Sequence, residues 1–155
     1  MNGLEGMPND FEALKTEISK HHSAQLELCN RLEKIADDLP DRYDKQECLS
    51  LSWQLYPAVL AGHKFEEEKL FPLILSIPNL STETGRNLER LKFEHWEDET
   101  SAEDICFALK QMVQSPEKAN IGKISYMLRG FFDGLRRHIA FESEYLLPQL
   151  KNALH

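Results

Sequence analysis

Four histidines interrupt four apolar stripes whose spacing is that of one face of an α-helix. Two of them begin the same motif, His-x-x-x-Glu, which pairs His63 with Glu67 and His138 with Glu142. Residues four apart leave a helix from the same face, so each pair can reach one partner. Because buried charged side chains are costly without a partner, the pattern predicts helices packed around a shared polar centre.

The apolar stripes predict helices over about residues 9–39, 44–76, 81–116 and 117–154. Asn9 or Asp10 is expected to cap the first and Ser81 or Thr82 the third. Pro57 and Pro72 predict kinks or a break in the second, and Pro148 a kink or early end in the fourth. No segment alternates in the manner of a strand. We therefore expect an all-α, antiparallel, up-down-up-down four-helix bundle that forms one domain over residues 1–155.

The composition excludes several classes of protein. A net charge of -8 argues against a surface for nucleic acid or anionic membrane, because phosphate binding needs a basic patch. The apolar stretches are too short to cross a membrane, and the first residues lack the pattern of a secretory signal. Three isolated cysteines, without a Cys-x-x-Cys pair, are typical of a reduced protein. We therefore expect a cytoplasmic location.

The polar interruptions lie away from the helix ends in all four stripes. Antiparallel packing can therefore bring them to one level of the bundle. The residues concerned are His21 and His22 in the first stripe, His63, Glu66 and Glu67 in the second, His95, Asp98 and Glu99 in the third, and His138 and Glu142 in the fourth.

Taken singly, each of these histidines is better explained as a hydrogen-bonded core residue, and Glu66 and Glu67 as part of a solvated face. Taken together at one depth, they favour a metal site. A set of imidazoles and carboxylates without thiolate is unlike structural zinc sites, and imidazole argues against magnesium and calcium. The set suits two iron or manganese ions bridged by carboxylates.

The order of these motifs resembles the hemerythrin-like, or HHE cation-binding, family from about Phe11 to Leu150. The resemblance rests on a helix-one histidine, on Glu94-His95, and on two His-x-x-x-Glu motifs. The first of these motifs is followed by Leu-Phe-Pro ending at Pro72, and the second by Leu-Leu-Pro ending at Pro148.

The resemblance implies a non-heme di-iron centre with an oxo or hydroxo bridge, and manganese or zinc are alternative metals. Glu67 and Glu142 would be the bridging carboxylates, and His63, His95 and His138 terminal imidazoles. In the first helix, both His21 and His22 are available, and the register of the apolar stripe favours His22. The expected metal ligands are therefore His22, His63, Glu67, His95, His138 and Glu142.

This chain departs from the family pattern in two places. Oxygen-carrying hemerythrins place two histidines one turn apart in the third helix, whereas here Leu91 and Glu99 flank His95. Glu99 or Asp98 could fill this position, or it could stay open to water, and a dedicated oxygen carrier is disfavoured. In addition, Pro72 follows His63 by one residue less than Pro148 follows His138, which keeps Glu66 open as an alternative to Glu67.

Three functions fit these observations. The first is a di-iron protein that binds oxygen, peroxide or nitric oxide at an open iron position, for sensing, scavenging or iron handling. The second is a di-iron oxidase or peroxidase, which turnover with peroxide would distinguish. The third is a metal-free or zinc-loaded helical interaction module. The expected partner is a small diatomic or peroxide ligand, with no nucleic acid or membrane, and a homodimer remains open.

Overall fold

The computed structural model describes residues 7–153, and side chains from residue 11 onward. This part of the chain is helical and contains no strand. Two of its long helices are extended through a π-helical turn into a short final helix. The elements are α1 (Met7–Asp38), α2 (Lys45–Phe65), η1 (Glu66–Leu70), α3 (Phe71–Leu75), α4 (Thr82–Gln114), η2 (Pro116–Lys118), α5 (Ile121–Phe141), η3 (Glu142–Leu146) and α6 (Leu147–Ala153).

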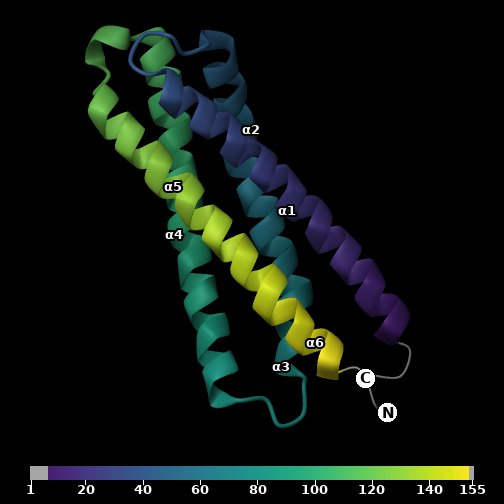
Figure 1. The fold of residues 1–155 in the computed structure, drawn as a ribbon. Coiled ribbons are helices and arrows are strands. Elements are labelled where there is room, and N and C mark those ends of the chain that lie inside the picture. Colours follow the sequence, from purple (N-terminus) through teal and green to yellow (C-terminus); the bar gives the residue numbers. More distant parts are fainter. Residues whose placement is uncertain (1–6, 154–155) are drawn as a thin grey trace.

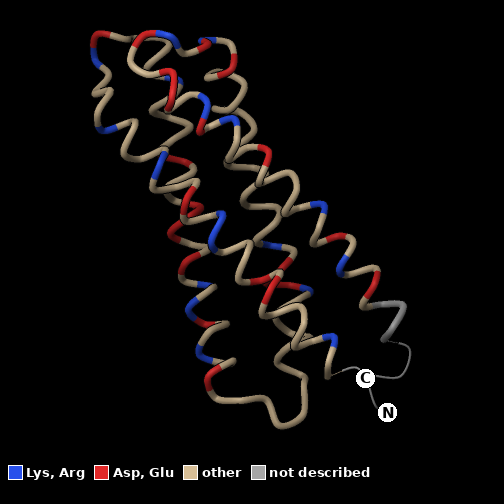
Figure 2. The backbone as a smooth tube through the Cα atoms, in the orientation of Figure 1, with Lys and Arg blue, Asp and Glu red and all other residues tan. Residues whose placement is uncertain are grey.

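The helices form the expected antiparallel bundle. Helix α1 packs against α2 and α5, and α4 packs against the same two helices from the other side. The start of α1, the end of α6 and the connection from α3 to α4 lie at one end of the bundle, and the connections from α1 to α2 and from α4 to α5 lie at the opposite end (Figure 1). Positions of acidic and basic residues are spread along the length of the helices (Figure 2). Within residues 7–153, no helix has the length and apolar character needed to cross a membrane.

The helix starts follow local capping chemistry. Ser81 caps α4 as expected, because its side chain accepts a hydrogen bond from the backbone N–H of Thr84. The fourth helix begins later than expected, because a 3₁₀ turn comes first and Asn120 then caps α5. The first helix begins at Met7, so neither Asn9 nor Asp10 is its cap.

The prolines do not all act as expected. Pro57 lies inside α2, which is continuous, so the break considered there does not occur. Before Pro72, the carbonyl of Glu66 accepts from the N–H of Phe71, five residues ahead, and that turn is π-helical. A proline has no N–H and crowds the carbonyl four residues before it, so a wider preceding turn relieves the chain.

The same π turn occurs before Pro148. There the carbonyl of Glu142 accepts from the N–H of Leu147. Glu66 and Glu142 are thus each the first residue of a π turn that comes before a proline.

The core is divided into two apolar clusters. The larger one lies toward the α1–α2 connection and includes Leu32, Leu55, Leu109 and Leu128. The smaller one lies toward the other end and is built from Phe11, Ile18, Leu70, Phe71, Ile74, Leu88, Leu91, Leu146, Leu147 and Leu150. Burial of apolar surface in both clusters stabilises the bundle and fixes the level at which the polar residues face one another.

Candidate metal centre

Buried polar side chains separate the two apolar clusters, and we call this group the polar layer. Each of its members is no more than 6% exposed. All four long helical segments contribute to it. The polar layer consists of His22 and Gln25 from α1, His63 from α2, Glu66 from η1, His95 from α4 and Glu142 from η3.

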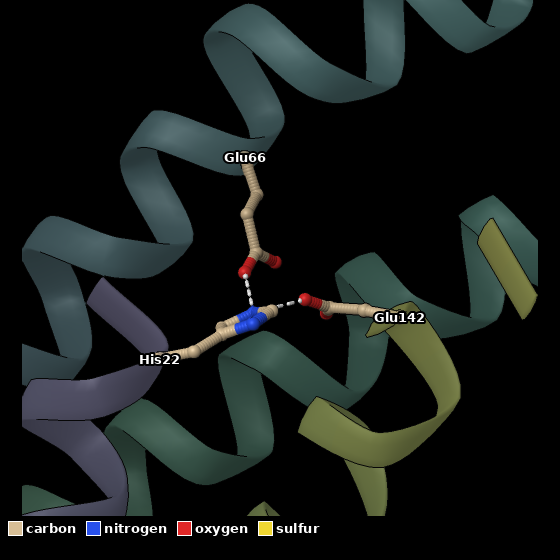
Figure 3. Close-up of side chains that lie close together, drawn as sticks. All are labelled: His22, Glu66 and Glu142. Atoms are coloured by element: carbon tan, nitrogen blue, oxygen red, sulfur yellow. Dashed lines mark hydrogen bonds and ion pairs between the residues drawn. The ribbon is translucent and has the colours of Figure 1, made fainter. Parts of the chain in front are cut away.

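His22 lies between the two glutamates of the layer (Figure 3). Its Nε2 is 3.1 Å from Oε1 of Glu66 and 2.9 Å from Oε2 of Glu142. These atoms lie close enough together to surround a single metal ion. The three residues come from helices that are far apart in the sequence, so the arrangement is a product of the fold.

His95 faces the same two carboxylates from the opposite side. Its Nε2 is 3.1 Å from Oε2 of Glu66 and 3.5 Å from Oε1 of Glu142. Each glutamate therefore directs one oxygen toward His22 and the other toward His95. The two imidazoles and the two carboxylates therefore form one buried histidine–carboxylate cluster.

Several atoms of the layer are buried and have no hydrogen-bond partner among the residues that the structure describes. They include both ring nitrogens of His95, Nδ1 of His63 and Oε2 of Glu66. The approach of His95 Nε2 to Glu66 is short enough for an ion pair but lacks hydrogen-bond geometry. Buried polar atoms are normally paired, so unpaired imidazole and carboxylate atoms at one point fit a metal centre. Nitrogen and oxygen donors without sulfur are suited to iron or manganese.

Without a metal, the cluster holds protons on its imidazoles. Burial lowers the pKa of His22, but the hydrogen bonds and charges of Glu142 and Glu66 outweigh burial and raise it to about 9. Burial also lowers the pKa of His95, but its close approach to Glu142 and Glu66 outweighs burial and raises the pKa to about 10. For Glu66, burial acts to raise the pKa, but His22 and His95 lower it, with the net result below its ordinary value. Burial and the charge of Glu66 raise the pKa of Glu142.

His63 lies against His95, with ring centroids 3.8 Å apart and planes inclined by 6°. Burial and the neighbouring charge of His95 lower its pKa to about 3, so this imidazole is neutral. Its Nδ1 is 3.5 Å from Oε1 of Glu99, a residue at the edge of the layer. The structure therefore brings the predicted ligand His63 to the centre, beside His95.

His138 lies at the edge of the layer and is not fully buried. Its Nδ1 is 2.8 Å from Oδ2 of Asp98, and its Nε2 is 2.9 Å from Oε2 of Glu94. The hydrogen bond to Asp98 raises its pKa despite partial burial. The side chain thus contacts α4 rather than Glu66, and sequence periodicity did not indicate this orientation.

The structure places Glu66, rather than the predicted Glu67, between the two imidazoles. Glu67 lies outside the cluster with a 33% exposed side chain, and its Oε2 is 3.7 Å from Nδ1 of His95. The π turn before Pro72 fixes this register, because it begins at Glu66 as its counterpart begins at Glu142. The proline spacing was the sequence signal for Glu66. In α1, His22 enters the cluster and His21 stays beside Glu17.

A four-helix bundle with a buried histidine–carboxylate cluster defines a class of helical metal-binding domains. The chain matches the family model described as the hemerythrin HHE cation binding domain over residues 14–150, and it belongs to this family. The match confirms the resemblance inferred from the motifs. Comparison with curated proteins and with solved structures found no match to this chain.

Proposed function

We propose that this domain holds two iron ions and binds a small oxidant or diatomic gas, namely oxygen, peroxide or nitric oxide, in the cytoplasm. One observation carries the proposal. Glu66 and Glu142 each direct one carboxylate oxygen toward His22 and the other toward His95. Two carboxylates shared in this way suit two metal ions better than one.

The remaining histidines complete the proposed ligand set. His63 lies against His95 and is neutral, which is the state that binds a metal. His138 is the sixth proposed ligand. Asp98 holds its Nδ1, and its Nε2, which contacts Glu94 here, is the nitrogen left for a metal. Iron held by imidazole and carboxylate supplies a position at which small ligands bind and exchange electrons.

Helix α4 has no second histidine one turn from His95, and this affects which small-ligand chemistry the centre favours. Glu99 occupies that place and approaches His63 rather than the carboxylate pair. A centre with fewer imidazoles and more nearby carboxylates favours oxidised iron, which supports sensing, scavenging or iron handling over reversible oxygen transport.

The proposal can be tested on protein made in iron-replete cells and purified without chelator. We expect about two irons per chain and a visible absorption band that shifts when azide, peroxide or nitric oxide is added. Glu66→Ala should lose both properties. Glu68→Ala, at an exposed neighbouring position, should keep them. Protein that takes up only zinc after iron reconstitution, or whose spectrum no small ligand changes, would contradict the proposal.

A further inference from the structure

Gln25 is the uncharged member of the polar layer. It is 2% exposed, and its Nε2 has no hydrogen-bond partner among the described residues. Burying an amide donor without an acceptor is unfavourable, so native proteins rarely leave one in this state. An acceptor outside the described chain is therefore the simplest reason for a glutamine here.

Gly62 of α2 makes the space in which this amide lies. A Cβ atom placed on Gly62 would be 2.4 Å from Nε2 of Gln25, closer than such contacts occur. The amide group is thus packed directly on the backbone of α2. Any larger residue at position 62 would displace it.

Gln25 and Gly62 both lie close in the sequence to residues of the metal centre. Gln25 follows His22 by three residues on α1, so both leave neighbouring points of one helix face. Gly62 directly precedes His63 and lies one helical turn before Glu66. The next buried residues on this face of α1, Leu28 and Cys29, belong to the larger apolar cluster. By this register, and by its contact with Gly62, the amide lies between that cluster and the centre, on the side of α1 and α2.

We propose that Gln25 donates a hydrogen bond to a small anionic ligand held at the metal centre, and that Gly62 positions the amide for this contact. The inference rests on the proposed function, because the ligand is held by the metal. A neutral donor suits this place, since it stabilises a bound anion without adding a charge beside His22.

The test compares azide binding by the iron-loaded wild type and Gln25→Met, which keeps the length of the side chain and removes the donor. We expect Gln25→Met to retain about two irons per chain and to raise the azide dissociation constant about tenfold. Metal-free Gln25→Met should also melt at a higher temperature, because the unpaired amide is gone. Gln46→Met, at an exposed site on α2, is the control and should leave azide affinity unchanged.

Gly62→Ala provides a second route to the same contact. It should weaken azide binding in the wild type by displacing the amide, and have no further effect in the Gln25→Met background. Unchanged azide affinity in an iron-loaded Gln25→Met variant would overturn this inference and leave the proposed function standing. Loss of iron in Gln25→Met would also overturn it, because the amide would then hold the metal or the fold. Absence of iron from the wild type would instead overturn the proposed function.

Discussion

Glu66 and Glu142 hold equivalent places in the two halves of the bundle. Each begins a π-helical turn that comes before a proline, and each lies within 3.1 Å of Nε2 of the same histidine, His22. The π turn is the local device that places each carboxylate in the core. Wider turns of this kind occur often at functional sites, because they redirect a side chain without ending the helix.

The π turn at Glu66 depends on Pro72, and Pro72→Ala tests this relation. Alanine supplies the missing N–H, so the turn can relax toward a regular α-helix and rotate Glu66 away from His22. We expect iron per chain to fall, while the melting temperature of the metal-free protein stays the same or rises. Pro57→Ala should leave the iron content unchanged, since Pro57 lies within α2, away from the π turn. Full iron content in Pro72→Ala would show that the proline does not set the register.

The stability of the metal-free protein should depend on pH through His22 and His95. Their folded pKa values of about 9 and about 10 lie above the ordinary value of 6.5. The unfolded chain therefore loses these protons first as the pH rises. The stabilising contribution is complete below about pH 6.5 and is lost as the pH rises through 9 to 10.

This effect can be measured by urea unfolding of chelator-treated protein at several pH values between 6.5 and 8.5. The range stays below the ordinary pKa of the cysteines, so that their thiols do not contribute. The free energy of unfolding should fall across this range in the wild type. The fall should be smaller in His22→Gln than in the wild type. In His21→Gln it should equal the fall in the wild type. A flat profile in the wild type would contradict the assigned protonation.

Metal binding should release protons, because His22 and His95 must be neutral to bind a metal. At pH 7 both are protonated in the metal-free protein. Calorimetry of metal binding in buffers of different ionisation enthalpy counts the released protons, and we expect about two per chain from His22 and His95, with a further contribution from His138, whose pKa Asp98 also raises. His63 contributes none, since its pKa is about 3. Binding without proton release would be inconsistent with the pairing of His22 and His95 with the glutamates.

Carboxylates at the edge of the polar layer should raise the metal affinity of the centre. Asp98 contacts Nδ1 of His138, and Glu67 lies near Nδ1 of His95. Such contacts orient metal-binding imidazoles, and their loss costs about 10- to 100-fold in metal affinity. We expect this range for Asp98→Asn and the lower end for Glu67→Gln, measured by competition with a chelator. Glu97→Gln, at an exposed position of α4, is the control and should bind as the wild type does.

The sequence was sufficient to predict the bundle, because four apolar stripes with the helical period leave few other ways to bury them. It also indicated His22, since the register of the α1 stripe distinguishes it from His21. The choice between Glu66 and Glu67 depended on a π turn, which shifts the register by less than one turn. Helical periodicity alone cannot detect such a shift, although the spacing to Pro72 reflects it.

Helical periodicity could not predict two features of the polar layer and its edge. The contacts of His138 with Asp98 and Glu94 depend on how α5 packs on α4, which involves residues far apart in the chain. The burial of Gln25 depends on Gly62, because only a residue without a side chain leaves room for the amide. A glutamine on a helix has no sequence signal that distinguishes a buried amide from an exposed one.

The most direct test of the account is iron content per chain in the wild type, Glu66→Ala and Glu67→Ala, produced and purified side by side without chelator. We expect about two irons in the wild type, well below two in Glu66→Ala, and near the wild-type value in Glu67→Ala. Full iron in Glu66→Ala together with loss in Glu67→Ala would contradict the assignment of Glu66. Fewer than two irons in the reconstituted wild type would contradict the dinuclear centre itself.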